Sequence, residues 1–445
     1  MRRLRASVVL LVVAAFLVVP MLAACSSNAS TTSAPAAKAT EAPKAAPTTA
    51  AAATKPAAEA TQPAAAAKPA GQAPSGAPIK IGLVDSFSGY SSAMGTPQRE
   101  AILALADQVN AEGGINGHPL QIIAYDDETD SSKSVLAVKK LIEQDKVVGI
   151  LGPCNTGMAM SDVPIVEAAK VPIITLNSSA AVLKPPAKYI FKLPLSEAFY
   201  VEGMFTYMKD QNLTKIGLLT QGDGFGKEAK KYFDDNAAKK GFKIVADESY
   251  GPNDTDITAP LTKIKATNPD VLVIYGAGPA GAIGVRQAKE LGFKVPIIIP
   301  DSLTMAAIMN VKELRDGLEG AIVAGHKPDV FKQLPDTDKQ KKIITDLDNL
   351  MQQKYHHPVS MWESNAYDVF TMMVNAAKKA NVDPTNLQAA RDKLRDAIEA
   401  TKDFVGAANI VSYSPTQHEI VRMDTLAINT IKDGQFKLVK TYNQP

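Results

Sequence analysis

Two cysteines, one tryptophan and five histidines are all that this 445-residue sequence contains of these three residue types. Only Cys154 lies in the part of the chain that can fold, so an internal disulfide framework is excluded. The folded part also lacks an excess of charge of either sign. Three arginines, four lysines and two glutamates precede residue 79. The remaining 41 of the 48 basic side chains and 44 of the 46 acidic side chains lie beyond it and nearly balance. Binding to nucleic acid needs a strong local excess of Lys and Arg, and is not expected.

The first 25 residues have the pattern of an export signal. Three arginines within the first five residues precede the apolar run SVVLLVVAAFLVVPML, which Pro20 interrupts. The run ends in Leu22-Ala23-Ala24-Cys25, which resembles the bacterial lipobox, where the cysteine sulfur takes a diacylglycerol. We predict a lipoprotein signal peptide over 1–25, lipidation of Cys25, and anchoring at the cell membrane or the periplasmic face of a membrane. A plain signal peptide or an uncleaved anchor helix are the alternatives.

The next segment has little that a folded core could use. Residues 26–77 comprise 52 residues with 22 alanines, 7 prolines and no aromatic side chain. Burial in such a segment cannot offset the entropy of ordering the chain, so 26–78 is predicted to be a disordered Ala/Pro/Thr linker. As a flexible coil it would span about 40 Å, which suits a spacer between a lipid anchor and a folded domain.

From Ile79 onward, short apolar runs alternate with stretches of helical periodicity. This alternation predicts parallel β-sheets covered by helices on both faces. The expected strands lie near 80–84, 120–125, 147–151, 171–176, 215–219, 242–249, 271–275 and 295–299. The expected helices lie near 98–111, 131–143, 157–169, 226–239, 256–267, 280–291, 337–354, 361–380 and 385–398.

The order of elements repeats once along the chain. Lys80-Ile-Gly-Leu-Val84 returns as Lys215-Ile-Gly-Leu-Leu219, and similar elements follow both. We therefore predict two doubly wound α/β lobes joined by a hinge. The first comprises 79–195 and 328–405, and the second 196–327 and 406–445. In such an arrangement the carboxyl ends of both sheets surround one ligand.

Signatures of catalysis are weak. The sequence has no GxSxG motif, its histidines (118, 326, 356, 357 and 418) lack the spacing of a metal site, and Cys154 has no histidine near it in sequence. Asp126-Asp127-Glu128 is more typical of a helix cap and a solvated loop than of a cation site. The stretch Gly276-Ala-Gly-Pro-Ala-Gly281 formally matches GxGxxG, but it lies inside a domain and contains a proline. We predict no enzyme, no cofactor and no metal.

Polar loops that follow three strands are more informative. Residues 152–157 (GPCNTG) and 177–179 (NSS) each lead from a strand towards a helix, where exposed N–H groups and short polar side chains suit a carboxylate. Asp301 follows a strand of the second lobe and suits an ammonium group. Plain N-capping explains each residue singly, so that alternative stays open.

A long stretch of the sequence resembles a known family. IKIGLVDSFSGYSSAMGTPQREAILALADQVNAEGGINGHPLQIIAYDDETD is similar to the start of the leucine/isoleucine/valine-binding proteins of ABC importers, which have the type I periplasmic binding fold. The similarity extends through VGILGP, KIGLLTQGDGFGKE and RQAKELGF to the helix around Tyr367. It implies a hinge-closing receptor that presents an amino acid to a membrane permease and acts as a monomer.

The resemblance also implies a set of ligand-binding residues. By position, the family's contacts to the ligand carboxylate and amino group fall on Asn155, Thr156, Asn177 and Ser179, and its acid falls on Asp301. A ligand-covering aromatic falls on Phe225, and an aromatic that lines the cleft falls on Trp362. Two further aromatic positions of the family appear here as Met94 and Ala277, which leaves aromatic acids, amides and other carboxylates open as ligands.

Three functions remain as hypotheses. The first is a solute-binding lipoprotein of an ABC importer that captures a branched-chain or related amino acid. The second is a receptor that senses another small carboxylate, aromatic acid or amide and docks on a membrane sensor. The third, a secreted enzyme, needs a nucleophile or metal geometry that the sequence does not offer.

Overall fold

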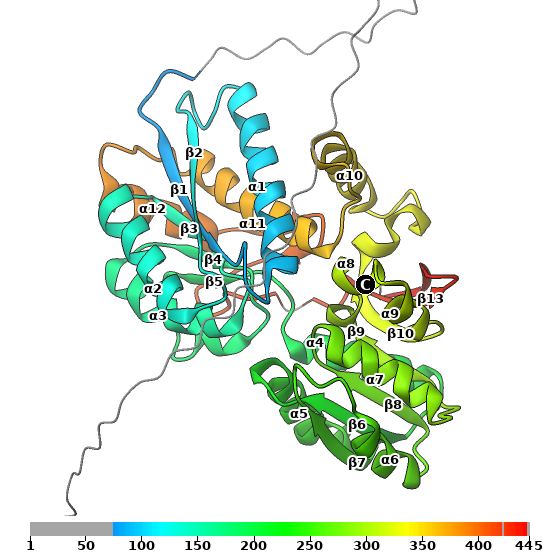
Figure 1. The fold of residues 1–445 in the computed structure, drawn as a ribbon. Coiled ribbons are helices and arrows are strands. Elements are labelled where there is room, and N and C mark those ends of the chain that lie inside the picture. The colour runs from blue at the N-terminus through cyan, green and yellow to red at the C-terminus, as the bar shows by residue number, and fades with distance from the viewer. Residues whose placement is uncertain (1–73, 421, 443–445) are drawn as a thin grey trace, which may run out of the picture. The chain divides into compact units, whose positions relative to one another are not determined.

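The computed structural model describes residues 74–420 and 422–442 (Figure 1). The predicted signal peptide and Cys25 lie outside the described residues, as does all of the predicted linker except 74–78. Within the described part, no helix is both long and apolar enough to cross a membrane. Two large β-sheets carry the fold, each with helices on both faces, and we call each sheet with its helices a lobe.

The sheet of the first lobe has five parallel strands in the order β2-β1-β3-β4-β5. Leu83 of β1 pairs with Leu151 of β3, which in turn pairs with Ile174 of β4. All carboxyl ends therefore meet at one edge of the sheet. The strands are β1 (Ile79–Asp85), β2 (Leu120–Asp126), β3 (Gly149–Leu151), β4 (Ile173–Thr175) and β5 (Ile190–Lys192).

Side chains that alternate along these strands bury against different helices. Leu83 and Leu151 pack on the face covered by α1 (Ser92–Ala111), α11 (Met361–Lys379) and α12 (Leu387–Glu399). Val84 and Ile150 pack on the face covered by α2 (Ser131–Lys140) and α3 (Thr156–Ala169). In Figure 1, α1 and α11 lie side by side, and α10 (Lys341–Tyr355) also contacts α1. Short helical turns are η1 (Leu141–Asp145) and η2 (Ala180–Leu183).

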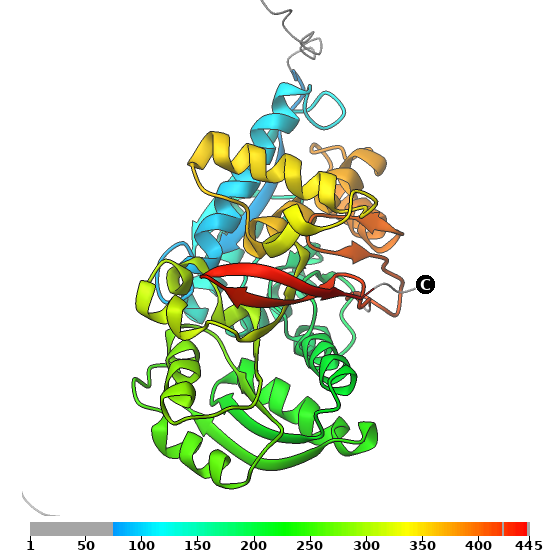
Figure 2. The same ribbon diagram turned by 90° about the vertical axis from the view of Figure 1, so that its right-hand side faces the viewer.

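The sheet of the second lobe is larger and mixed, with seven strands in the order β14-β13-β10-β9-β8-β6-β7. Five strands are parallel, and an antiparallel hairpin of β13 and β14 (red in Figure 2) extends the sheet beyond β10. The strands are β6 (Lys215–Gln221), β7 (Lys243–Tyr250), β8 (Val271–Tyr275), β9 (Ile297–Pro300), β10 (Ile322–His326), β13 (Leu426–Lys432) and β14 (Gln435–Thr441).

Helices also cover both faces of the second sheet. Leu218 and Val273 bury against the face of α4 (Glu197–Asp210) and α5 (Gly224–Asn236), and Leu219 and Ile274 against the opposite face. That opposite face carries α6 (Thr258–Ala266), α7 (Pro279–Glu290), α8 (Ala306–Met309) and α9 (Lys312–Gly317). The remaining short elements are η3 (Ala238–Lys240), η4 (Asp301–Leu303), η5 (Lys327–Gln333), β11 (Phe404–Val405) and β12 (Ile410–Val411).

The two-lobe α/β prediction is confirmed, with additions that the sequence did not reveal. Strands β5, β10, β13 and β14 and helix α4 were not predicted, and the second sheet is mixed instead of wholly parallel. The predicted helix at 98–111 begins earlier, at Ser92, because Pro97 is accommodated inside α1. The chain passes between the lobes after β5, after η5 and after β12, so each lobe is built from separate segments.

Candidate ligand-binding site

The loops at the carboxyl edge of the first sheet are tied to one another. Gly152 adopts φ 88°, and a Cβ there would lie 2.0 Å from the carbonyl oxygen of Val84, so only glycine permits this close approach. The next turn brings the backbone N–H of Cys154 to 3.0 Å from Oδ1 of Asp85. Burial raises the pKa of Asp85 to about 6, although the N–H groups of Cys154 and Ser86 oppose the shift.

Asn155 and Thr156 stand at the N-terminus of α3, as predicted from their position in the sequence. The side-chain oxygen of Asn155 accepts a hydrogen bond from Gly157 N at 2.9 Å and so caps the helix, and Thr156 is its first residue. With 14 residues, α3 is long enough to present a positive end of the helix dipole at this edge. The amide nitrogen of Asn155 lies 3.3 Å from the hydroxyl of Tyr90.

Asn177 and Ser179 form the neighbouring loop, after β4. Leu176 N donates to the carbonyl of Pro153 at 3.1 Å, which joins this loop to the preceding one. Both side chains are buried: Asn177 Nδ2 donates to the carbonyl of Ser179 at 3.2 Å, and Ser179 Oγ caps η2. Oδ1 of Asn177 is buried and has no hydrogen-bond partner among the described residues. The loop therefore holds an acceptor that remains to be satisfied.

In the second lobe, Phe225 lies in the turn that opens α5. Asp223 caps this helix by accepting from Gly226 N at 2.9 Å, and Gln221 bridges Asp223 to the backbone N–H of Ala277. The ring of Phe225 is half-buried and packs on Tyr275, with ring centroids 5.0 Å apart. The Phe225 ring thus contacts the carboxyl end of β8.

Asp301 follows β9 and is nearly fully buried. Its Oδ2 lies 2.6 Å from Nδ1 of His326, the last residue of β10, and the described residues provide no partner for Oδ1. The hydroxyl of Tyr200 is 3.5 Å from both ring nitrogens of His326. Burial lowers the pKa of His326, but the charge and hydrogen bond of Asp301 outweigh it and leave the pKa raised. The predicted acid is thus half of a buried acid–imidazole pair.

Apart from the hydrogen bonds within α11, Trp362 has one hydrogen bond among the described residues, through its backbone. It lies in the first turn of α11, where its backbone N–H donates to Oγ of Ser360 at 3.1 Å, and its side chain is half-buried. Ser360 and Glu363 form a capping box that fixes the start of this helix. Among the described contacts none joins Trp362 to the other predicted site residues.

Sequence reasoning missed two residues at these strand ends, Tyr90 and His326. Tyr90 is 79% exposed yet hydrogen-bonded to Asn155. Partial burial raises the pKa of Tyr90, the hydrogen bond from Asn155 opposes the shift, and the charge of Asp223 adds to it. The sequence could have indicated Tyr90, because it is an aromatic residue in the polar loop 86–91. Met94, which was matched to an aromatic position of the family, lies inside α1. His326 gave no signal, because its partner is 25 residues away in sequence.

The glycine-rich stretch after β8 has a packing role. A Cβ on Gly276 would lie 2.1 Å from the hydroxyl of Tyr250, and one on Gly281 would lie 2.5 Å from a methyl group of Leu303. Gly278 adopts φ 82° as the residue that precedes α7. The glycines of this formal GxGxxG motif therefore permit close packing around Tyr250 and Leu303.

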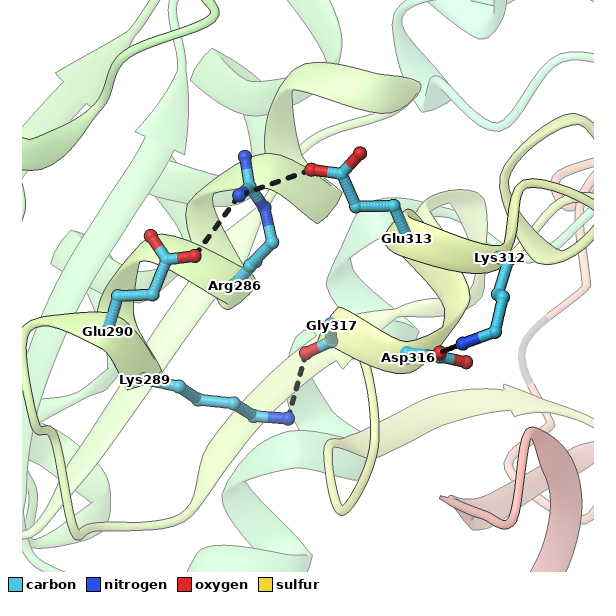
Figure 3. A pocket seen from close by; sticks show the side chains of 7 residues that line it. All are labelled: Arg286, Lys289, Glu290, Lys312, Glu313, Asp316 and Gly317. Atoms are coloured by element: carbon cyan, nitrogen blue, oxygen red, sulfur yellow. Dashed lines mark hydrogen bonds and ion pairs between the residues drawn. The ribbon is translucent and has the colours of Figure 1, made fainter.

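A hollow of about 570 Å³ between the C-terminal half of α7 and α9 lies away from the predicted site residues (Figure 3). Its charges are paired internally. Arg286 lies 3.1 Å from Glu290 and 3.3 Å from Glu313, and Lys312 lies 2.5 Å from Asp316. Lys289 donates to the backbone carbonyls of Gly317 and Glu319. Because these charged groups already have partners, we place the candidate site at the strand ends instead.

The fold and this edge define a class of protein: a two-lobed α/β ligand-binding protein with helix N-termini, amides and a buried acid at the carboxyl ends of its strands. The family model described as periplasmic binding protein matches residues 78–435. The chain therefore belongs to the periplasmic binding protein family, a family of exported substrate-binding proteins and not of enzymes. The family resemblance inferred from the sequence is confirmed.

Curated relatives and solved structures that are similar to this chain are also ligand-binding proteins. The chain is 25% identical over 332 residues to the leucine-, isoleucine-, valine-, threonine- and alanine-binding protein of Pseudomonas aeruginosa, covering 72% of this chain and 82% of that one. An extracellular ligand-binding receptor from Rhodopseudomonas palustris matches with a TM-score of 0.74 at 25% identity, covering 81% and 99%. The branched-chain amino acid binding protein LivJ of Streptococcus pneumoniae, in complex with isoleucine, shares the fold with a TM-score of 0.68 at 24% identity, covering 81% and 99%.

Proposed function

We propose that this protein is a lipid-anchored solute receptor of an ABC importer. It captures a branched-chain or related amino acid between its lobes and delivers it to a membrane permease. Membership of the periplasmic binding protein family and similarity to proteins named for leucine, isoleucine and valine support the proposal. The lipid on Cys25 and a linker over 26–78 would keep the receptor close to the permease.

The observation that carries the proposal is a pair of opposite electrostatic anchors on the two lobes. On the first, the N-terminus of α3 at Asn155 and Thr156 offers backbone N–H groups and a positive dipole end to a carboxylate. On the second, Asp301 offers a buried carboxylate with Oδ1 free of partners among the described residues. An α-amino acid has both charges on one carbon atom, so it can bind both anchors at once.

The other predicted residues complete the proposed site. Asn177 and Ser179 lie in the loop beside α3, and the buried Oδ1 of Asn177 is an acceptor for a ligand N–H. Phe225 and Trp362 are proposed as apolar walls around the ligand side chain. Tyr90, which is exposed and hydrogen-bonded to Asn155, is proposed as a cover that closes over the ligand.

Ligand capture is proposed to proceed by hinge closure of the monomer. The division into 79–195 with 328–405, and 196–327 with 406–445, remains a proposal. Residues 407–409 hydrogen-bond to Asp368 of α11, and the carbonyl of His418 accepts from Lys192 N at 2.8 Å. These contacts tie residues 407–409 and His418 to the first lobe. They favour a last passage between the lobes near residue 420 instead of at the predicted boundary between 405 and 406.

Calorimetric titration of the purified protein with L-leucine, L-isoleucine and L-valine tests the proposal. We expect binding by the unaltered protein and a loss of at least about a hundred-fold in Asp301→Asn, because an uncharged amide leaves the desolvated ligand ammonium without its counter-charge. Asp346→Asn, on the exposed face of α10, is the matched control and should bind as the unaltered protein does.

Two outcomes would contradict the proposal in different ways. If an aromatic acid or an amide binds while the three amino acids do not, the ligand class is wrong and the receptor is of the second kind considered above. If the amino acids bind equally well to Asp301→Asn, the ligand class is right, but Asp301 is not the ammonium partner.

A further inference from the structure

The geometry around Asp301 places a titratable group behind the proposed ammonium partner. Strands β9 and β10 are neighbours, with Ala324 paired to Pro300, so the residue after β9 lies beside the end of β10. A Cβ on Gly325 would lie 3.3 Å from Cβ of Asp301, and glycine at this position leaves room for the carboxylate to approach. The result is the 2.6 Å contact between Asp301 Oδ2 and Nδ1 of His326.

His326 is fully buried, and the charged groups that act on its ring are carboxylates. Tyr200 of α4 packs edge-on against its ring at 5.5 Å between centroids, with the hydroxyl 3.5 Å from both nitrogens. Besides Asp301, the charges of Asp329 in η5 and Asp368 in α11 act on the ring. Burial lowers the pKa of His326, yet these carboxylates together leave it above its ordinary value of 6.5.

Other titratable groups stand close to this cluster. Burial, and then the charge of Asp301, raises the pKa of Asp329 to about 7, while His326 opposes that rise. Burial raises the pKa of Glu197, on α4, to about 7 as well. Lys327, the residue after His326, is paired with Asp338 at 2.9 Å and so has its own counter-charge. Any test of His326 must therefore separate it from Asp329.

We propose that His326 is a positioning residue that couples ligand binding to proton release: the neutral imidazole holds Asp301 for the ligand ammonium, and the imidazolium competes with that ammonium. The proposal rests on the proposed function. In the neutral form, Nδ1–H donates to Oδ2 of Asp301 and leaves the negative charge for a ligand at Oδ1. In the protonated form, the imidazolium neutralises the same carboxylate. An ammonium that binds therefore expels one proton from His326 to solvent.

The coupling fixes the sign of the pH dependence. Because His326 is protonated below its raised pKa, affinity for an amino acid should fall as pH decreases through that value and stay constant above it. With one proton released per ligand, the affinity should fall about tenfold for each pH unit on the acid side. A ligand that carries a carboxylate and no ammonium would not show this fall, since it has no charge to compete with the imidazolium.

The test is a calorimetric titration of the purified protein with L-leucine between pH 5.5 and 8.5, in buffers of different ionisation enthalpy. For the unaltered protein we expect release of about one proton per leucine on the acid side, with the tenfold slope. His326→Asn keeps a short N–H donor near the position of Nδ1 but cannot carry charge, so its affinity should become independent of pH. His418→Asn is the matched control, since His418 is also buried and lies 3.0 Å from a carboxylate oxygen of Glu399; it should retain the slope.

A second measurement needs neither a variant histidine nor a ligand. NMR titration of the histidine rings in the unaltered protein should show a ring with a pKa above 6.5, and the pKa of that ring should fall in Asp301→Asn. In the calorimetric titration with L-leucine, Asp329→Asn should retain the pH dependence of binding. If Asp329→Asn removes that dependence while His326→Asn keeps it, Asp329 is the titrating group and the proposal for His326 is overturned.

The failures of the two proposals can be told apart. If leucine binds with an affinity that does not change with pH, or if His326→Asn keeps the slope, the proposed function stands and only the role of His326 is wrong. If no amino acid binds at any pH, the proposed function fails and the proposal for His326 fails with it.

Discussion

Replacing Asp162 by asparagine should stabilise the protein at neutral pH and destabilise it in acid. Asp162 lies on α3 with 1% of its surface exposed. Oγ of Ser134, on α2, donates to Oδ2 at 2.7 Å, and Oδ1 is buried with no partner among the described residues. Burial raises the pKa of Asp162 from 3.8 to about 7. The hydrogen bond from Ser134 lowers this pKa, and the charge of Asp127 raises it further.

The sign follows from comparing the folded and unfolded chains. Below pH 3.8 the carboxyl is protonated in both states and contributes nothing to the pH dependence. Between 3.8 and about 7 the folded protein keeps a proton that the unfolded chain releases, so stability falls as pH rises, and the full penalty is present above 7. A difference of about three pKa units corresponds to about 4 kcal/mol as an upper limit.

Asparagine carries no charge at any of these pH values. Its oxygen can still accept from Ser134, but its buried NH₂ group would replace an unpartnered oxygen at a cost of about 1–2 kcal/mol. Relative to the unaltered protein, Asp162→Asn should therefore be about 2–3 kcal/mol more stable at pH 8 and about 1–2 kcal/mol less stable at pH 4.

Urea unfolding followed by circular dichroism at pH 4, 6 and 8 measures this reversal. Asp234→Asn, on the exposed face of α5, is the control and should differ little from the unaltered protein at any of the three values. A difference between Asp162→Asn and the unaltered protein that is the same at all three pH values would refute the reasoning.

Two further predictions concern the anchor and the long helix of the first lobe. Cys25→Ser should move the protein from the membrane fraction to the soluble fraction and remove the mass of a diacylglycerol from the mature chain; a variant that stays membrane-bound would show that another segment anchors it. Asp368→Asn should lower the free energy of unfolding at pH 7 by about 2–4 kcal/mol, because the two carboxyl oxygens accept backbone N–H groups from all of 407–409 and the amide nitrogen of asparagine would face at least one of these donors. Burial raises the pKa of Asp368 to about 7, but here, unlike at Asp162, three backbone donors lose or share their acceptor. An unchanged urea midpoint in this variant would contradict that account.

Periodicity predicted the buried parallel strands and the amphipathic helices, because each has a local pattern. The missing elements lack one. Strand β5 has only three residues, and α4 is apolar over much of its length, so neither shows a clear period. The hairpin of β13 and β14 did carry a signal, the Asp433-Gly434 turn with φ of 53° and 67°. Its antiparallel addition to the second sheet depends on pairing with residues 100 or more positions away in sequence, which no local pattern reveals.

The candidate site shows the same division. Asn155 and Asp301 were predicted because the residues after parallel strands gather at one edge of a sheet, and each follows a strand at the carboxyl edge of its own sheet. What the sequence could not provide is which side chains meet: His326 was one of five scattered histidines until β9 and β10 proved to be neighbours. Phe225 and Trp362 were carried over by resemblance, and their contact with a ligand remains a prediction.

The central claim is that one ligand binds through an ammonium and a carboxylate at the same time. Titration of the unaltered protein at pH 8 with L-leucine, leucinamide and 4-methylpentanoate tests it most directly, because these share the side chain and differ only in the two charges. We predict that leucine binds and that each analogue binds at least about a hundred-fold more weakly, since either one leaves a buried anchor unpaired. Equal affinity for leucine and for either analogue would contradict the account.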